Sequence, residues 1–219
     1  MTSKMDLAES VVGVVLAGGR SRRMGGGDKC LLPLGGQPVL AHVLERLKPQ
    51  VSQIVIAANG DLTRFAGFHV PVIADHIDGH AGPLAGIHAG MDWAHANVPD
   101  SRFVITVASD TPFFPADLVT RFCAAIEGRD LKLLVASSRS GVHPVFGLWP
   151  LTLAAVLEAS LRSGKRKVTD WVRERRAEEI SFPAVEIGGR PIDPFFNINR
   201  PEDLAEAEAL LSAGGGTAD

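Results

Sequence analysis

Residues 11–29 constrain the fold of this chain more than any other stretch, because they join an apolar run to a glycine-rich, cationic loop. They read VVGVVLAGGRSRRMGGGDK, and the β-branched run at the start predicts a buried strand. Glycines let a ligand approach bare backbone N–H groups, and successive N–H groups form a concavity that binds anions. The loop therefore predicts a polyphosphate site at the end of the first strand, supported by four cations against one carboxylate: Arg20, Arg22, Arg23 and Lys29 against Asp28.

The segments around this loop alternate between strand and helix patterns. Strands are expected at residues 11–17, 53–58, 70–74, 102–108, 131–136, 143–149 and 181–187. Helices are expected at 38–48, 82–96, 115–126, 150–161, 168–175 and 201–212. This alternation predicts an α/β fold that is three-layered and Rossmann-like, with a mostly parallel central sheet and helices on both faces. A length of 219 residues fits a single domain, expected over residues 11–212 between flexible tails at 1–10 and 213–219.

Composition and charge exclude several classes of protein. Hydrophobic residues make up 46% of the chain, so a substantial core is expected. The net charge of -3 makes the basic loop a local feature, so we expect no nucleic acid partner. We expect no membrane partner either, since no apolar run approaches the roughly 20 residues of a membrane span and residues 1–10 do not resemble a signal peptide. Two distant cysteines, Cys30 and Cys123, suggest neither a disulfide framework nor a metal site and fit a cytoplasmic protein.

Two common nucleotide-binding loops do not fit residues 18–30. A P-loop requires glycine before its lysine and a hydroxyl residue after it, whereas Lys29 lies between Asp28 and Cys30. A Rossmann fingerprint could begin at Gly25 and Gly27, but Cys30 occupies the place of its third glycine. The loop must therefore bind its anion in another way.

The pattern that remains over residues 16–32 is L-A-G-G-x-S-x-R-M-G-x(2)-D-K-x-L-L. It resembles the signature loop of nucleotidyltransferases of the nucleotide-diphospho-sugar transferase fold. Within that group it is similar to the molybdenum cofactor guanylyltransferases, whereas the cytidylyl-transferring relatives more often have alanine at the position of Gly18. The resemblance implies that GMP is transferred from GTP to the terminal phosphate of molybdopterin, with Mg²⁺ as cofactor and pyrophosphate as second product. It also implies transient contact with other cofactor-biosynthesis proteins or recipient molybdoenzymes.

The resemblance assigns the nucleotide and its metal to segments that follow the first four strands. Lys29 and Arg23 would neutralise the triphosphate and the departing pyrophosphate, and Asp110, in the S-D-T-P segment, would be the metal ligand. That position suits the role, because open α/β sheets bind ligands at the carboxyl ends of their strands and Mg²⁺ prefers one or two carboxylates plus phosphate oxygens. Further nucleotide contacts are expected from Leu16, Ala17, Gly18, Gly19, Asn59, Asp75, Gly82 and Leu84.

Some of these contacts have a plain structural alternative. The family often has Asn-Ala-Asn where this chain has Ala57-Ala58-Asn59, so Asn59 either replaces the missing asparagine or forms an Asn-Gly turn. Asp75 would contact the guanosine or form an Asx turn. In the GPLAG segment, residues 82–86, glycines would let the backbone reach the guanine edge, and the same segment suits a helix start with Pro83 at its first position.

The carboxyl-terminal part of the chain resembles the family's acceptor side. Molybdopterin contacts are expected from His143, Lys165, Arg166, Asn197 and Asn199. The cations at 165–167 could bind a phosphate and an anionic dithiolene, or form a solvated basic loop. Asparagine often caps helices, but with Pro201 at the first helical position the cap is Arg200. Asn199 therefore lies one residue early, which favours a functional role.

Other functions are compatible with the same pattern. The chain could transfer a cytidylyl group to molybdopterin, or a nucleotidyl group to a sugar phosphate, with the choice of base set by GPLAG and Asp75. A non-catalytic nucleotide-binding module is a further alternative, against which the presence of Asp110 argues.

Overall fold

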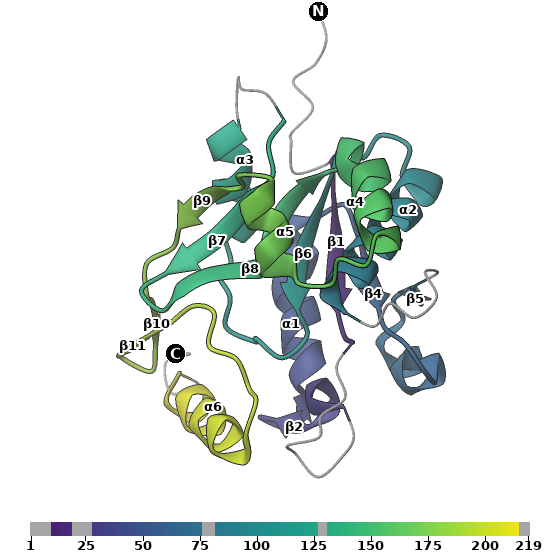
Figure 1. Ribbon diagram of the computed structural model, residues 1–219. Helices are drawn as coiled ribbons and strands as arrows, with labels where there is room; N and C mark the ends of the chain where they lie inside the picture. Colours follow the sequence, from purple (N-terminus) through teal and green to yellow (C-terminus); the bar gives the residue numbers. More distant parts are fainter. Residues whose placement is uncertain (1–9, 19–27, 76–81, 127–130, 215–219) are drawn as a thin grey trace, which may run out of the picture.

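A computed structural model describes residues 10–18, 28–75, 82–126 and 131–214 (Figure 1). Its centre is a seven-stranded sheet in the order β5-β4-β1-β6-β8-β7-β9. The strands are β1 (Val11–Leu16), β4 (Gln53–Ala57), β5 (Val72–Ile73), β6 (Phe103–Ala108), β7 (Leu134–Ser138), β8 (Gly141–Pro150) and β9 (Glu178–Ser181). Gly19 and Arg23, both expected at the nucleotide, lie outside the described residues. The expected amino-terminal tail also lies outside them, apart from Ser10.

The sheet is mostly parallel, as predicted. β1 pairs in parallel with β4 and β6, β4 with β5, and β7 with β9. β8 is antiparallel to both of its neighbours, β6 and β7. The exception has a local cause: only Arg139 and Ser140 separate β7 from β8, and such a short connection allows a hairpin but not a parallel crossover.

Helices cover both faces of the sheet, which confirms the three layers (Figure 1). α2 (Pro83–Asn97), α4 (Ala154–Arg162) and α5 (Val168–Glu174) pack on one face, and α1 (Val39–Leu47) and α3 (Leu118–Ile126) on the other. Successive side chains of β1 point to opposite faces of the sheet, so one strand packs against both helix layers. Val12 and Val14 belong to the apolar cluster under α2, α4 and α5, and Val11 and Val15 belong to the cluster under α1 and α3. Full burial of such a side chain contributes about 1.5–3 kcal/mol.

A smaller assembly brings the last helix of the chain together with short hairpins from near both of its ends. α6 (Pro201–Gly214) packs near two short hairpins, β2 (Pro33–Leu34) with β3 (Gln37–Pro38), and β10 (Val185–Ile187) with β11 (Arg190–Ile192). Four 3-10 helices complete the described elements: η2 (Lys29–Leu31), η3 (Lys48–Gln50), η4 (Leu62–Phe68) and η5 (Leu151–Leu153). A separate apolar cluster holds this assembly together and includes Leu34, Phe113, Ile198 and Leu210.

The structure differs from the sequence-based expectation in some boundaries. The strand expected at 181–187 is two strands, β9 and β10, because Pro183 has no N–H with which to continue a ladder. The polar residues of β9 hid its start, and such residues are typical of an edge strand. The last helix ends at Gly214 rather than Ser212, so it extends two residues into the expected tail.

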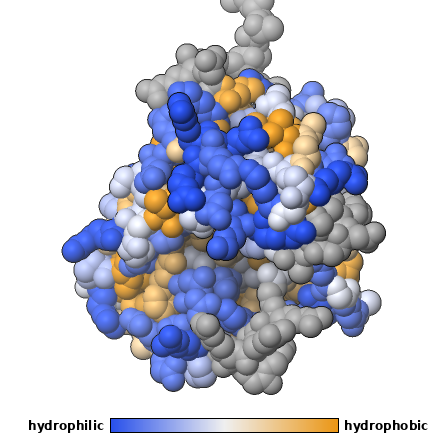
Figure 2. Space-filling view, in the orientation of Figure 1, coloured by the Kyte–Doolittle hydropathy of each residue, from blue (hydrophilic) through white to orange (hydrophobic). Residues whose placement is uncertain are grey.

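The surface agrees with a fold whose apolar residues face inward. Hydrophilic residues cover most of the face in Figure 2, and apolar residues appear there in small, separate groups. Within the described ranges, none of the helices combines the length and the apolar character that a membrane span requires.

Candidate active site

The carboxyl ends of the parallel strands bring the predicted nucleotide residues to one edge of the sheet. Gly18 follows β1, Asn59 follows β4, Asp75 follows β5 and Asp110 follows β6. β5, β4, β1 and β6 are neighbours in that order, so these four segments lie along a continuous edge (Figure 1). Such an edge is where open α/β sheets bind ligands.

Three residues predicted for different substrates meet at this edge. Lys29 Nζ donates a hydrogen bond to Asn199 Oδ1 at 2.6 Å and lies 3.6 Å from Asp110 Oδ2. The backbone strengthens the arrangement, because Ile198 N–H donates to the carbonyl oxygen of Asp110 at 2.9 Å. The segment before α6 is therefore attached to the end of β6, and Lys29 lies between the two.

Asp110 is a poorly solvated carboxylate. Burial raises its pKa, and the charge of Lys29 opposes that rise without cancelling it. Thr111 Oγ1, a fully buried hydroxyl, lies 3.4 Å from Asp110 Oδ1 and donates to it. A carboxylate whose charged form is disfavoured in this way gains stabilisation from any cation placed beside it.

Asn199 is held in place by the start of α6. Asp203 Oδ2 accepts hydrogen bonds from the backbone N–H groups of Asn199 and Arg200, each at 2.8 Å. Arg200 C=O accepts in turn from Asp203 N–H at 3.1 Å, which makes Arg200 the cap, as the sequence indicated. Asn199 is thus one residue before the helix, and its side chain contacts Lys29 instead of capping α6.

Asn59 and Asp75 bind each other. Asn59 Nδ2 donates to Asp75 Oδ2 at 2.6 Å, and Asp75 N–H donates to Asn59 Oδ1 at 3.2 Å. The ends of β4 and β5 are therefore coupled through side chains as well as through the sheet.

The backbone around β1 is only partly available to a nucleotide. Ala17 N–H donates to Ala57 C=O at 2.9 Å, and Leu16 C=O accepts from Ser109 N–H at 3.2 Å, so both groups extend the sheet. We expected the amide of Ala17 to bind the nucleotide, and this hydrogen bond occupies it. Gly18 is exposed, and a Cβ built there would meet no atom within 4 Å, so a ligand could approach its backbone closely.

The GPLAG segment forms the first turn of α2, after Gly82 as N-cap. The side chain of Leu84 is fully buried in the core, so only its backbone can face a ligand. Gly86 has a packing role, since a Cβ there would lie 3.0 Å from Leu16 Cδ2, and at Gly90 it would lie 2.5 Å from Val14 Cγ2. The two glycines let α2 approach β1, which gives Gly86 a packing role, and the contact of this segment with the guanine edge stays a prediction.

His143 belongs to a cluster of polar groups that the sequence did not predict. Its Nε2 lies 2.8 Å from Ser138 Oγ, which donates to Asp193 Oδ2 at 2.7 Å. Its ring lies 4.3 Å from that of Phe195, measured between centroids. Burial lowers the pKa of His143, and the charge of Asp193 partly opposes this. No pattern in the sequence places Ser138 and Asp193 together, since 55 positions separate them.

The five residues expected at molybdopterin do not form one group. Lys165 forms an ion pair with Glu174, and Arg166 donates to the carbonyl oxygens of Leu161 and Lys165. A Cβ at Gly82 would lie 3.7 Å from the carbonyl oxygen of Arg166, so this basic loop lies beside the start of α2. Asn197 is exposed and, with Asn199, belongs to the segment that lies against Asp110, whereas His143 belongs to the polar cluster with Asp193.

Cys30, next to Lys29, is not a candidate nucleophile. Burial raises the pKa of its thiol to about 11, so the thiol is neutral near pH 7. Within the described part of the chain, no group of three or more His, Cys, Asp or Glu side chains could hold a metal ion.

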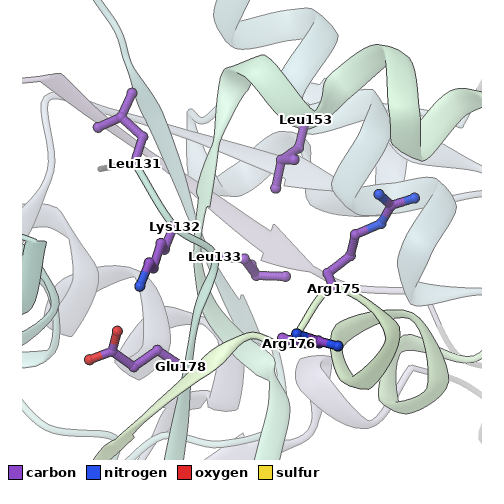
Figure 3. A pocket seen from close by; sticks show the side chains of 7 residues that line it. All are labelled: Leu131, Lys132, Leu133, Leu153, Arg175, Arg176 and Glu178. Carbon is purple, nitrogen blue, oxygen red and sulfur yellow. The ribbon is translucent and has the colours of Figure 1, made fainter. Parts of the chain in front are cut away.

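A cavity of about 580 Å³ lies away from this edge. Figure 3 shows its lining residues, which come from the segment directly before β7, from η5, from the segment after α5 and from the start of β9: Leu131, Lys132, Leu133, Leu153, Arg175, Arg176 and Glu178. Since β7 runs in the direction of β6, its start lies at the opposite edge from Asp110. The cavity is separate from the candidate site.

Comparisons with known proteins agree with the fold and the loop. A family model described as a MobA-like NTP transferase domain matches residues 13–179. The chain is 47% identical over 208 residues to a molybdenum cofactor guanylyltransferase of Mesorhizobium japonicum, covering 94% of this chain and 99% of the relative. It is 51% identical over 204 residues to that of Rhizobium leguminosarum bv. trifolii, covering 93% and 94%. A crystal structure of molybdopterin-guanine dinucleotide biosynthesis protein A from Archaeoglobus fulgidus has the same fold, with a TM-score of 0.68 at 24% identity over 92% of this chain and 98% of that one.

Proposed function

Because this chain belongs to the family of molybdenum cofactor guanylyltransferases, we propose that its residues transfer GMP from GTP to the terminal phosphate of molybdopterin in the way derived below. The chain is a nucleotidyltransferase that makes the guanine dinucleotide form of the molybdenum cofactor. The observation that carries the residue assignment is the meeting of Lys29, Asp110 and Asn199.

In this reaction an oxygen of the pterin's terminal phosphate forms a bond to the α-phosphorus of GTP. The bond between that phosphorus and the bridging oxygen to the β-phosphate breaks, and pyrophosphate leaves with the electron pair. The step needs two anions to be brought together in line and charge to be neutralised, rather than a covalent intermediate. Lys29 suits both needs, because its ammonium group lies between the end of β6 and the segment before α6.

Asp110 is the residue that we propose to hold Mg²⁺. Its carboxylate fits such an ion, because burial leaves it poorly solvated and Mg²⁺ prefers one or two carboxylates completed by phosphate oxygens and water. Nucleotidyltransferases of this family typically depend on a metal. When bound, the ion would supply charge stabilisation to the phosphate oxygens.

The nucleotide would occupy the edge formed by β1, β4 and β5. Gly18 offers open backbone, the Asn59–Asp75 pair faces the same edge, and Gly82 and the amide of Leu84 begin α2 there. Asn59 then takes the place of the asparagine that the family has and this chain lacks at Ala57. Gly19 and Arg23 remain part of the proposal on the grounds of sequence alone.

Molybdopterin would approach from the opposite side of Lys29. Asn197 and Asn199 lead into α6, and the cluster of His143, Ser138 and Asp193 offers donors and acceptors to a heterocycle. Lys165 and Arg166 lie beside Gly82, so a contact of theirs with the acceptor would be at its phosphate end. We also propose that the reaction occurs in the cytoplasm and that the product passes through transient contacts with cofactor-biosynthesis proteins or recipient molybdoenzymes.

The test is release of pyrophosphate from GTP, CTP, ATP and UTP, each with and without molybdopterin and Mg²⁺. We expect release only with GTP and only when molybdopterin is present. Equal release from CTP would contradict the choice of base, and release without the pterin would contradict the acceptor.

A further inference from the structure

We propose that Arg64 is a positioning residue for the nucleotide, which holds the segments after β1 and β4 at a fixed spacing and offsets the charge of Asp28. This inference rests on the proposed function, because it concerns how the same site receives GTP. Arg64 belongs to none of the motifs described above and lies on η4, a 3-10 helix between β4 and β5.

The guanidinium of Arg64 is held by four groups at once. Its Nη2 donates to the carbonyl oxygen of Asn59 at 2.9 Å, its Nη1 donates to that of Asp61, and its Nε forms an ion pair with Asp28 Oδ2. The group also lies 4.4 Å from the centre of the Phe65 ring, which is fully buried. A planar fork of donors suits this set of partners, and no other cationic side chain could satisfy all of them.

Local sequence explains why Arg64 occupies this place. Gly60 has a φ of 82°, which turns the chain after β4, and Asp61 caps η4 by accepting the Thr63 N–H at 3.0 Å. The first turn of η4 therefore presents Arg64 back toward Asn59 and toward Asp28. Arg64 and Asp28 are both mostly buried, with 22% and 21% of their side-chain surface exposed, so their charges are less screened than on an open surface.

The contact with Asp28 fixes the residue directly before Lys29. Asp28 is the N-cap of η2, and aspartate commonly caps a helix with its carboxylate, yet this carboxylate makes no capping hydrogen bond. It pairs with Arg64 instead. The backbone of Asp28 still begins η2, since its carbonyl accepts the Leu31 N–H at 3.0 Å. Holding Asp28 thus holds the start of the turn that carries Lys29.

The contact with Asn59 extends the connection to the other side of the nucleotide site. The side chain of Asn59 binds Asp75 through two hydrogen bonds, while its carbonyl accepts from Arg64. A chain of contacts therefore runs from Asp28 through Arg64 and Asn59 to Asp75, across the ends of β1, β4 and β5. One end, Asp28, is next to Lys29, which is proposed for the triphosphate, and the other end, Asp75, is itself proposed for the guanosine.

Arg64 also has an electrostatic role. An uncompensated Asp28 carboxylate beside Lys29 would repel the triphosphate that Lys29 attracts. Paired with Arg64, Asp28 adds almost no net charge to the site. Loss of Arg64 therefore has two consequences: the spacing relaxes, and a negative charge is released next to the phosphates.

The experiment measures kcat and KM for GTP, by pyrophosphate release with saturating molybdopterin, in R64A, R64K, D28N and R64A/D28N. We expect R64A to raise KM for GTP by about tenfold to a hundredfold, as for groups that orient ligand-binding residues at metal sites, with a smaller fall in kcat. R64K should recover part of the loss, because lysine keeps the pairing with Asp28 but cannot donate to both carbonyls. D28N alone should raise KM for GTP about threefold. The ion pair that holds the start of η2 is lost in this variant, but no unpaired negative charge is left beside the phosphates.

The direction in which KM for GTP changes between R64A and R64A/D28N decides whether Arg64 offsets the charge of Asp28. If Arg64 offsets Asp28, D28N added to R64A lowers KM for GTP relative to R64A alone. R121A is the matched control, because Arg121 also pairs with an aspartate and lies over an aromatic ring, on α3, outside the described contacts of the site. Its KM should equal that of the unsubstituted protein.

An unchanged KM in R64A, or a double variant worse than R64A, would overturn the inference. If circular dichroism shows that R64A does not fold, D28N decides, and an unchanged KM for GTP in D28N overturns it. Failure of the proposed function looks different, because the unsubstituted protein would then release no pyrophosphate from GTP.

Discussion

At the scale of single residues, Lys29 connects the two proposed halves of the site. Its ammonium group contacts Asn199, 170 positions away in the sequence, and lies close to Asp110. Neither partner neutralises it completely, since Asn199 is uncharged and Asp110, at 3.6 Å, is the residue that we propose to hold Mg²⁺. Lys29 therefore retains charge for an incoming phosphate.

Replacement of Lys29 by alanine should remove turnover while leaving the fold intact. We expect kcat/KM for GTP to fall about a hundredfold to a thousandfold, because a preorganised cation at the reacting phosphates is lost. Pyrophosphate release measures the loss, and thermal unfolding checks the fold. Lys132→Ala, in the cavity at the other edge of the sheet, is the control. Turnover within threefold of the unsubstituted enzyme would contradict the assigned role.

Replacement of Asp110 by asparagine should separate stability from activity. Burial raises the pKa of Asp110 above its ordinary value of 3.8, so folding disfavours the charged form. Because the folded-state pKa lies above the unfolded one, the penalty lowers the stability of the metal-free protein at pH values above 3.8. Below pH 3.8 the carboxyl is protonated in both states and the penalty disappears. Metal-free D110N should therefore have a higher Tm at pH 7, an advantage that shrinks as pH falls toward 4, and should lose Mg²⁺-dependent pyrophosphate release.

Scanning calorimetry with a chelator present measures the difference in Tm between D110N and the unsubstituted protein. The pH is varied from about 4 to 8, which includes the range in which proteins are usually most stable. The exposed Asp100, replaced by asparagine, is the control. A lower Tm for D110N at pH 7 would contradict the burial penalty, and an unchanged Mg²⁺ dependence of pyrophosphate release would assign the metal to another residue.

At the scale of elements, α6 and α2 each position one half of the site. α6 does so through its first turn, where Asp203 binds the backbone of Asn199 and Arg200. α2 does so through close packing on β1, which Gly86 and Gly90 allow. A change in either helix should therefore affect one substrate more than the other.

Asp203→Ala should weaken the acceptor side. A hydrogen bond to a charged group contributes about 1.5–3 kcal/mol, and loss of the Asp203 carboxylate also releases Asn199. We expect KM for molybdopterin to rise while KM for GTP stays nearly constant, as measured by initial rates with each substrate varied. Glu202→Ala, in the same turn, is the matched control. Equal increases in both KM values would contradict a role confined to the acceptor.

Gly90→Ala should destabilise the domain. A Cβ there would lie 2.5 Å from Val14 Cγ2 and 2.7 Å from Val14 Cγ1, on a central strand that cannot move away cheaply. Such overpacking costs about 1–3 kcal/mol, more than the gain in helix propensity. Urea unfolding measures the difference. Gly67→Ala, where a Cβ would meet no atom within 4 Å, should change stability by less than about 0.5 kcal/mol. A G90A variant as stable as G67A would show that α2 packs less tightly than described.

At the scale of the whole molecule, one sheet serves two substrates. The parallel strands β5, β4, β1 and β6 carry the proposed nucleotide residues, while the β7–β8 hairpin and the segment before α6 carry the proposed acceptor residues. The two halves join at the end of β6, where Ile198 and Asn199 lie against Asp110 and Lys29. The reaction requires this arrangement, because the attacking and leaving groups must lie on opposite sides of one phosphorus.

Much of this could be predicted from local patterns. The strands around Val11–Leu16 and Phe103–Ala108, the layered fold, the family of the loop and the guanylyltransferase activity were all predicted and are confirmed. Each depends on short spacings, such as alternating apolar residues or a glycine loop after a strand. Physical forces between residues near in sequence determine such features, so a single sequence is enough.

The tertiary structure alone decided which distant side chains meet. The pairing of Lys29 with Asn199, the cluster of His143 with Asp193, and the bridge of Arg64 between Asp28 and Asn59 have no sequence signal. Only the structure shows that the Ala17 amide is hydrogen-bonded within the sheet and that the basic loop at Arg166 lies beside Gly82. The physical reason is that these contacts depend on how helices pack on the sheet and where each crossover returns the chain. That packing is determined by all the core side chains together, and no single motif in the sequence specifies it.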